Sequence, residues 1–332
     1  MKAKKNNYKE TNSKKDKEYS VSIPVLIVGF NRPHIIKQSF ECVRAAKPKK
    51  IYIAIDGPRK NVKRDDALVK EVKKIVNDID WKCDVYTRFN KVNRGCAITV
   101  SSAISWVLQK EEYVIIIEDD IIAPLSFFKF AEEMLKRYKN YPRITMVTGC
   151  NYTPIPTPGN VDYFFNKYPH IWGWATWARA WEGYDLYLKI PEEHTKEYFL
   201  KKICNSKAEV RYYQKLFKRL IEKGSGNIAW GWIYLYRHRV NDFFSITPKV
   251  NLTSNIGVYG VHGHGMNKKY YFKKYDKNFV VKKHPGKVKY FKKFDIYHFK
   301  KHIDDRITLA KRIINKTKKI NKILKGILKI KK

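Results

Sequence analysis

The sequence predicts an α/β fold with a mostly parallel central sheet, because strand-like and helix-like segments alternate over its first 150 residues. The clearest strand is residues 113–117, where four β-branched residues in a row indicate burial on both faces. Three carboxylates, Glu118, Asp119 and Asp120, follow it directly. Ligands of open α/β sheets bind outside the carboxyl ends of the strands, so this stretch is the first candidate for a functional site.

The elements on either side of this strand follow from apolar spacing and from turn residues. An apolar strand over residues 23–30 ends before Pro33, which favours the first turn of a helix. Apolar positions at helical spacing then cover residues 34–46, and strand 51–55 ends before Gly57, which favours a turn. The same criteria predict helices at residues 68–76, 93–108, 125–138 and 195–223, a helix after Trp232, and strands at residues 84–88, 144–148 and 245–251.

Composition limits the classes of protein that fit. A hydrophobic content of 44% is enough for a substantial core. Five widely spaced cysteines, without a Cys-x-x-Cys pair, argue against a disulfide framework and a zinc site and favour a reducing compartment. Neither a Gly-x-Gly-x-x-Gly nor a P-loop motif is present, which argues against dinucleotide dehydrogenases and P-loop NTPases. A bound nucleotide would therefore be held through a metal and side chains.

The net charge of +38 favours a polyanionic partner, either nucleic acid or an anionic membrane. Much of this charge lies at the ends of the chain. Residues 1–18 carry seven Lys against three acids, and residues 266–332 carry 24 Lys plus Arg against four acids. No nucleic-acid recognition motif accompanies the charge, which argues against nucleic acid as the partner.

The C-terminal sequence favours the membrane. Over residues 303–332, Ile and Leu recur at helical spacing with Lys between them, which is typical of an interfacial amphipathic helix, although a helix packed on the domain has the same pattern. There is neither a membrane-spanning apolar run nor a signal peptide, so the expected location is the cytoplasm, on the inner face of the plasma membrane. We expect a disordered basic N-terminus over residues 1–18, a main domain over residues 19–265 and a basic extension over residues 266–332.

The three carboxylates after strand 113–117 would repel one another unless a positive charge lay beside them. A divalent cation that carries a diphosphate fits, because Mg²⁺ and Mn²⁺ take hard oxygen ligands from one or two carboxylates and from phosphates. A charged turn without a metal is the alternative. Arg32 and Asp56 end the first two strands, so a parallel sheet would bring them to the same edge. There Arg32 could pair with a phosphate and Asp56 could accept hydrogen bonds from a base or ribose.

These residues, in this order, resemble nucleotide-sugar glycosyltransferases of the GT-A (Rossmann-like) fold. The resemblance extends over about residues 20–265, and it is to the N-acetylglucosaminyltransferase I family and, still more, to related bacterial surface-polysaccharide glycosyltransferases. The matching stretches are Arg32, Asp56, residues 116–120 with Pro124 and Phe127-Phe128, Trp172-Gly173-Trp174, residues 248–251, Ser254-Asn255-Ile256-Gly257 and His262-Gly263.

The resemblance implies roles for single residues. Asp120 would coordinate the metal, and Glu118 and Asp119 would hold the ribose and the water shell of the metal. Asp56 would bind the nucleotide base, Arg32 would lie near the nucleotide, and Asn93 and Arg94 would line the pocket for base and sugar.

The chain departs from the family at one position. The family places its catalytic carboxylate after a Trp, whereas here Gly231 follows Trp230. An inverting transferase needs a base for the acceptor proton, and Gly cannot supply one. Either Asp242 or His264 replaces it, or the acceptor differs, or activity is lost.

The expected function is a hexosyl- or N-acetylhexosaminyltransferase that uses Mn²⁺ or Mg²⁺. It would move a sugar from a nucleotide diphospho-sugar, with UDP as the expected nucleotide, to a hydroxyl of a surface glycan such as lipopolysaccharide or capsule. A lipid-linked glycan is one option for the acceptor. The alternatives are a non-catalytic protein of the same fold that binds nucleotide sugars or glycans and, with less support, a nucleic-acid binder.

Overall fold

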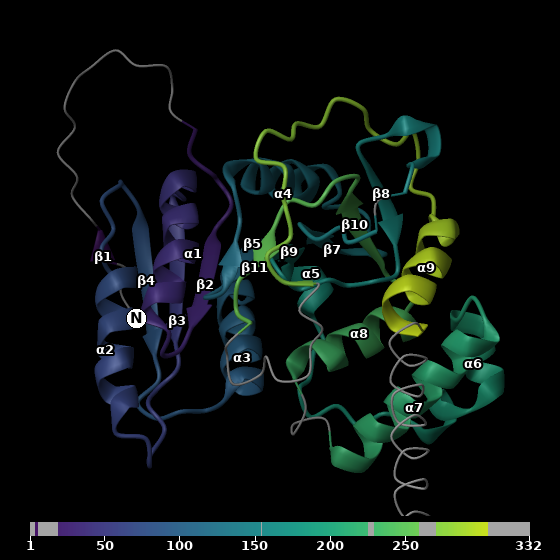
Figure 1. The fold of residues 1–332 in the computed structure, drawn as a ribbon, viewed down its shortest axis with the longest axis horizontal. Helices are drawn as coiled ribbons and strands as arrows, with labels where there is room; N and C mark the ends of the chain where they lie inside the picture. Colours follow the sequence, from purple (N-terminus) through teal and green to yellow (C-terminus); the bar gives the residue numbers. More distant parts are fainter. Residues whose placement is uncertain (1–3, 6–18, 154, 225–228, 259–269, 305–332) are drawn as a thin grey trace, which may run out of the picture.

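The computed structural model of the chain describes residues 4–5, 19–153, 155–224, 229–258 and 270–304. Helices cover both faces of one central sheet, whose strand order is β1-β4-β3-β2-β5-β9-β7-β10-β8 (Figure 1). Its strands are β1 (Lys4–Lys5), β2 (Val25–Gly29), β3 (Lys50–Ile55), β4 (Asp84–Phe89), β5 (Tyr113–Glu118), β7 (Ile144–Thr148), β8 (Tyr163–Asn166), β9 (Trp174–Trp177) and β10 (Phe244–Pro248).

The first half of the sheet is parallel. Strands β4, β3, β2 and β5 run side by side in one direction, so their carboxyl ends meet at one edge. The second half begins with β9, which is antiparallel to β5 and β7, and then continues with β10 parallel to β7. A separate two-stranded ladder, β6 (Ile121–Ile122) with β11 (Ser254–Asn255), lies just beyond the end of β5.

Helices follow the strands as the alternating sequence pattern predicts. The α-helices are α1 (Pro33–Ala46), α2 (Arg64–Val76), α3 (Cys96–Leu108), α4 (Leu125–Arg137), α5 (Ala178–Trp181), α6 (Glu197–Ile203), α7 (Lys207–Lys223), α8 (Trp230–Val240) and α9 (Lys292–His298). Shorter turns are η1 (Pro158–Asn160), η2 (Glu192–Thr195) and the π-helical η5 (Phe299–Asp304).

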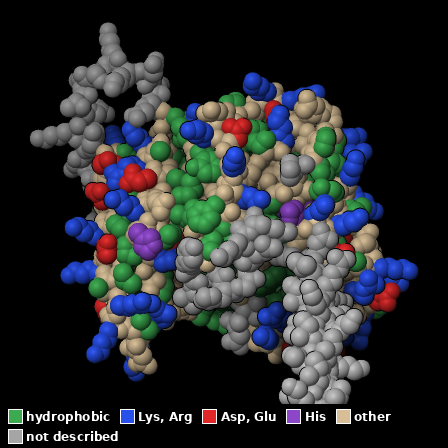
Figure 2. Space-filling model, viewed as in Figure 1, with side chains coloured by type: hydrophobic (Ala, Val, Ile, Leu, Met, Phe, Trp, Pro, Cys, Tyr) green, Lys and Arg blue, Asp and Glu red, His purple; other side chains and the backbone are tan. Residues whose placement is uncertain are grey.

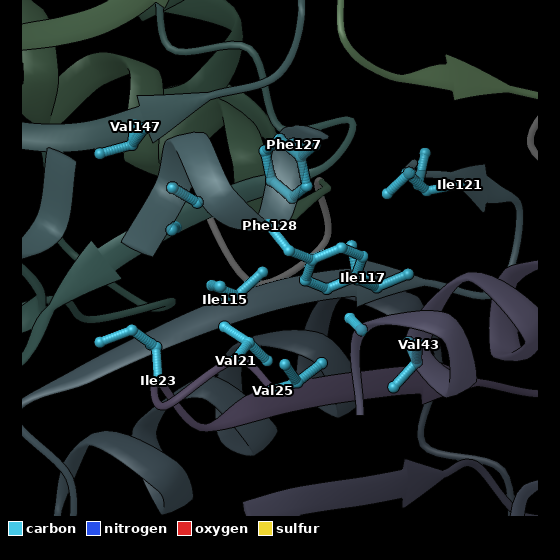
Figure 3. Close-up of a cluster of buried hydrophobic side chains, with 14 of the residues drawn as sticks. Val21, Ile23, Val25, Val43, Ile115, Ile117, Ile121, Phe127, Phe128 and Val147 are labelled. Atoms are coloured by element: carbon cyan, nitrogen blue, oxygen red, sulfur yellow. The ribbon is translucent and has the colours of Figure 1, made fainter. Parts of the chain in front are cut away.

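Two hydrophobic cores hold the layers together. One lies between the sheet and α1, α2 and α4, and Figure 3 shows part of it, with Ile115 and Ile117 of β5 close to Phe127 and Phe128 of α4. The other lies on the opposite face, where α3 and α8 pack against the alternate side chains, such as Val114. Strand β5 is therefore buried on both faces, as its β-branched sequence predicts.

The predicted fold class is confirmed: the chain forms an α/β, Rossmann-like fold with a mostly parallel central sheet flanked by helices. The structure adds detail at two places. The helical stretch predicted over residues 195–223 is divided into α6 and α7, because Ser206 caps α7 by accepting a hydrogen bond from the Glu209 backbone N–H. The aromatic stretch that contains Trp174 and Trp177, for which the sequence predicts no secondary structure, is a central strand, β9, and is part of the core.

The basic extension is partly described, and residues 270–304 pack on the domain. Phe279 enters the core beside α4, and α9 lies against β8. Residues 1–3, 6–18 and 305–332 lie outside the described residues, and with them the expected N-terminal disorder and most of the amphipathic C-terminal helix. Within the described part of the chain, no helix combines the length and apolar character that spanning a membrane requires.

Candidate active site

The candidate site lies at the edge where β2, β3 and β5 end. Parallel pairing sets Val28 beside Glu118 and Gly29 beside Ile55, so the residues that follow these strands meet there. Arg32 begins α1 just beyond β2, Asp56 follows β3, and Glu118 closes β5. The structure thus brings together residues that are far apart in the sequence.

Arg32 binds both aspartates of the acidic triplet. Its Nε donates to Asp119 Oδ2 at 3.2 Å, and its terminal nitrogen donates to Asp119 Oδ1 and, at 3.0 Å, to Asp120 Oδ2. The Ser39 hydroxyl, from α1, donates to the backbone carbonyl of Asp119 at 2.7 Å and fixes the turn. Asp119 is buried, and Arg32 and Asp120 are partly exposed, so this ion pair faces the outside of the sheet edge.

The triplet carries more negative charge than Arg32 neutralises. Burial and the neighbouring Asp120 and Asp119 raise the pKa of Glu118 to about 8. Burial and Asp119 raise the pKa of Asp120 to about 6, although Arg32 opposes the shift. Burial disfavours the charge of Arg32, but the two aspartates outweigh it and raise the pKa of its guanidinium.

The ladder of β6 and β11 forms the wall behind Asp120. Asn255 Nδ2 donates to Asp120 Oδ1 at 3.3 Å, and the Ile256 backbone N–H donates to the Asp120 carbonyl at 2.9 Å. Gly257 lies so close to the carboxylate that a side chain there would overlap it. Tyr271 is also near, since burial and Asp120 together raise the pKa of its phenol.

The donor set fits a divalent cation. The triplet offers carboxylate oxygens, which Mg²⁺ and Mn²⁺ prefer, and a cation would relieve the charge that raises two pKa values. In the part of the chain that the structure describes, no group of three His, Cys or acidic side chains is arranged to hold a metal ion by itself. The residues therefore fit a cation that one or two carboxylates hold and that phosphate oxygens complete.

Asp56 holds the loop before α3. Its carboxylate accepts hydrogen bonds from Asn90 Nδ2 and Asn93 Nδ2, both at 2.9 Å, and from the backbone N–H groups of Gly57, Arg94 and Gly95 at 2.9–3.2 Å. Five donors leave little acceptor capacity for a base or ribose. The Asn93 amide faces Asp56 and the Gly57 carbonyl, whereas Arg94 is exposed.

The structure does not bring Asp242 to this site. Asp242 follows α8 and precedes β10, at the edge where β7 and β10 begin, and its carboxylate pairs with Arg143 and Lys167. Strand β9 is antiparallel to both β5 and β7, so β7 and its parallel neighbour β10 run in the same direction as β5. Asp242, which precedes β10, therefore lies at the edge of the sheet opposite to the one that carries the triplet. His264, the other candidate base, lies outside the described residues.

Gly231 lies in the first turn of α8, near the edge that carries the triplet. Its neighbour Trp230 stacks on Trp174, with ring centroids 5.6 Å apart, and Trp174 pairs with Ile116 two residues before Glu118. Among the described residues, a Cβ on Gly231 would meet only the end of the Ile171 side chain, at 2.9 Å. The position therefore accepts a side chain if the end of Ile171 shifts.

No separate role is predicted from the sequence for Asn90, Asn255 or Tyr271. The Ser254-Asn255-Ile256-Gly257 stretch is among the matches of the resemblance, so the ladder behind Asp120 had a sequence signal. Asn90 had none, because its role depends on the distance between the end of β4 and Asp56.

Comparisons with known proteins give little further information. No protein family matches the sequence, and no curated protein matches it. Among solved structures, the chain is similar to mannosyltransferase PcManGT from Pyrobaculum calidifontis in complex with GDP-Man and Mn²⁺, at a TM-score of 0.28 and 16% identity, over 42% of this chain and 40% of that one.

Two further structures are comparably distant. A UDP-glucose pyrophosphorylase complexed with UDP-glucose has a TM-score of 0.25 at 10% identity, over 38% of this chain and 56% of that one. A cytidylyltransferase from Leptospira borgpetersenii serovar Hardjo-bovis has a TM-score of 0.29 at 13% identity, over 62% of this chain and 74% of that one. The chain thus spans less than two thirds of the first two proteins, and TM-scores this low say nothing about activity.

Proposed function

We propose that the protein is a metal-dependent glycosyltransferase of the GT-A type that uses a nucleotide diphospho-sugar. The observation that supports this most is the contact of Arg32 with Asp119 and Asp120 at the carboxyl edge of a parallel sheet. This arrangement puts a guanidinium, which binds phosphate bidentately, beside carboxylates that can hold a divalent cation. A diphosphate with its cation matches both groups at once.

Each residue then has a role that its contacts support. Asp120 would hold the metal, Mn²⁺ or Mg²⁺, which when bound supplies Lewis-acid stabilisation of the leaving diphosphate. Asp119 holds Arg32, which would bind the phosphates, and Glu118 would lie beside the ribose and the water shell of the metal. Asp56 is a positioning residue, because it fixes the loop of Asn93 and Arg94 that would line the pocket for base and sugar.

The expected donor and acceptor are those that the resemblance implies. UDP is the expected nucleotide, and the transferred group is a hexosyl or N-acetylhexosaminyl residue. The acceptor is a hydroxyl of a surface glycan such as lipopolysaccharide or capsule, presented on a lipid at the inner face of the plasma membrane. The basic sequence of residues 266–332 would hold the protein at that surface.

A binding protein of the same fold is the second candidate. Gly231 occupies the place where the resemblance implies a catalytic carboxylate, and Asp242 lies at the opposite edge of the sheet. A protein with this site could bind a nucleotide sugar without transferring it rapidly, because the loss of a general base costs about 10²–10⁴ in rate.

The test is isothermal titration of UDP into the protein with and without Mn²⁺, after a thermal-shift screen of nucleotide sugars. Asp120→Ala should abolish the metal-dependent part of the affinity and leave the unfolding temperature close to that of the wild type. Asp66→Ala is the matched control, because Asp66 is an exposed acid on α2. Equal Mn²⁺-dependent affinities for Asp120→Ala and the wild type would exclude the metal site.

A further inference from the structure

The exposed side of α9 and η5 carries a stripe that has no part in the site described above. Its members recur every four residues along the helix: Lys292 and Lys293, then Ile296 and Tyr297, then Lys300 and Lys301. All six are exposed, and Ile296 and Tyr297 retain 43% and 39% of their accessible surface. The stripe is an adjacent apolar and aromatic pair between two pairs of lysines.

The opposite side of the same helix is firmly attached to the domain. The buried Asp295 accepts hydrogen bonds from the Tyr290 hydroxyl at 2.8 Å and from the Lys167 backbone N–H at 3.1 Å. Phe294 packs on Phe164 with ring centroids 4.6 Å apart, and His298 is 2.8 Å from the Thr153 hydroxyl. Since these contacts fix the rotation of α9, the stripe is a preformed surface.

Charge alone does not distinguish this stripe, because Figure 2 shows Lys and Arg side chains at many places on the visible face. Two further features do. Within the described residues, none of the four lysines forms an ion pair with a carboxylate. Asp295, the acid of α9, is buried on the other side, and Asp304, at the end of η5, is half-buried. The exposed Ile296 and Tyr297 lie between the two pairs of lysines.

We propose that the stripe of α9 and η5 docks on an anionic phospholipid bilayer. The lysines would meet the phosphate headgroups, and Ile296 and Tyr297 would enter the interfacial layer, which aromatic side chains with a polar tip prefer. The chain continues from Asp304 into a basic sequence in which residues 311–332 hold ten Lys plus Arg and no acid. The inference deepens the proposed membrane location by naming the surface that docks, and it does not depend on the transferase activity.

Co-sedimentation of the full-length protein with phosphatidylcholine vesicles, with and without phosphatidylglycerol, tests the proposal. Changing Lys292, Lys293, Lys300 and Lys301 together to Gln should lower the partition coefficient on the anionic vesicles at least tenfold. The double variant Ile296→Ser, Tyr297→Ser keeps every charge and should still lower it several-fold. Residues 305–332 are present in every variant, so the difference reports the stripe itself.

The matched control changes four exposed lysines around α2, namely Lys63, Lys70, Lys74 and Lys82, to Gln. Helix α2 lies at the other end of the molecule from α9 (Figure 1), so this variant removes the same charge elsewhere. We expect it to bind anionic vesicles within about twofold of the wild type. An equal loss in both lysine variants, or no loss in the Ile296 and Tyr297 variant, would overturn the proposal.

Duplex DNA tests whether the stripe binds nucleic acid instead of an anionic membrane. Fluorescence anisotropy with a labelled duplex should give the same affinity for the stripe variants and the α2 control variant. A loss of DNA binding that is larger than the loss of vesicle binding in the stripe variants would assign the surface to nucleic acid instead. Thermal stabilisation by UDP with Mn²⁺, measured on the same variants, reports the proposed site separately.

Discussion

The backbone of Gly257 lies directly against the carboxylate of Asp120. A Cβ on Gly257 would overlap Oδ2 of Asp120 and also crowd its Cγ and Cβ, so rotation of the carboxylate alone could not relieve the clash. The position of Gly257 is fixed in turn, because its N–H donates to Asn255 Oδ1 at 2.7 Å. The residue proposed to hold the metal therefore depends on a glycine 137 positions later in the chain.

Gly257→Ala should displace Asp120 or the β6–β11 ladder and weaken Mn²⁺-dependent UDP binding at least tenfold. Isothermal titration measures this loss. Gly286→Ala is the matched control, because no atom of the described residues lies within 4 Å of the position where its Cβ would stand. If both variants bind UDP with Mn²⁺ as tightly as the wild type does, metal binding at Asp120 does not require the close contact with Gly257.

Because the pKa of Glu118 is raised, ionisation of this carboxyl lowers the stability of the folded protein at neutral and alkaline pH. Its folded pKa of about 8 lies above the ordinary value of 4.5, so between these values the folded state holds more protons than the unfolded state. The free energy of unfolding must then fall as the pH rises from about 4.5 to 8. Asp120, with a pKa of about 6, adds to the fall at the acid end of this window.

Glu118→Gln should remove most of this dependence and raise the stability of the metal-free protein at pH 8 by about 1–3 kcal/mol. Urea unfolding at pH 5 and pH 8 measures the effect, and Glu41→Gln, an exposed position on α1, is the control. Mn²⁺ should stabilise the wild type more at pH 8 than at pH 5, because the cation binds the ionised carboxylates. A Glu118→Gln variant with the same pH dependence as the wild type would contradict the pKa assignment.

The role of Asp56 as a positioning residue predicts a local effect. Asn at this position keeps the shape but directs an N–H₂ group toward N–H donors of Asn90, Asn93, Arg94 or Gly95. Leaving such buried donors without an acceptor costs about 1–3 kcal/mol. Asp56→Asn should therefore lower the free energy of unfolding by about 2 kcal/mol and speed trypsin cleavage after Lys91 and Arg94, the basic residues of this loop.

Limited proteolysis followed by mass spectrometry measures the rate at these two bonds. Asp66→Asn, at an exposed position of α2, should leave it unchanged. If UDP binding falls in Asp56→Asn while cleavage after Lys91 and Arg94 stays slow, Asp56 contacts the nucleotide directly and is not a positioning residue.

The parallel half of the sheet is predictable from sequence because its strands are buried on both faces and therefore read as continuous apolar runs, as residues 114–117 do. The meeting of Arg32 with the acidic triplet follows from that prediction, since parallel strands end at one edge. Strand β9 is not predictable in this way. Its sequence is also that of an aromatic core cluster, and only its pairing with β5 and β7 shows that it is a strand.

The parts of the site that depend on loop geometry are the ones that sequence reasoning misses. The N–H groups of Arg94 and Gly95 reach Asp56 because the loop turns at Gly95, whose φ is +80°. Nothing in the residue types reveals that convergence. Asp242 shows the converse, since residues that are close in sequence can lie far apart in the fold. It follows Gly231 by only one helix, but α8 carries the chain across to the other edge of the sheet.

Gly231 offers the most direct way to separate a slow transferase from a binding protein. The position is in the first turn of α8, where an acidic side chain interacts favourably with the helix dipole. Among the described residues, its Cβ would displace only the end of Ile171. Trp230, fixed against Trp174, holds this turn in place. Gly231→Asp should therefore fold as well as the wild type.

If the wild type lacks a general base, Gly231→Asp should raise UDP release from the UDP-sugar with Mn²⁺ by about 10²-fold. Gly231→Asn is the matched control, because it has the same size without the charge and should not raise the rate. A coupled assay of UDP release, with and without acceptor, distinguishes transfer from hydrolysis. Should the wild type already turn over rapidly, with Gly231→Asp no faster and Asp242→Asn no slower, neither position supplies the base, and the acceptor proton leaves through another group.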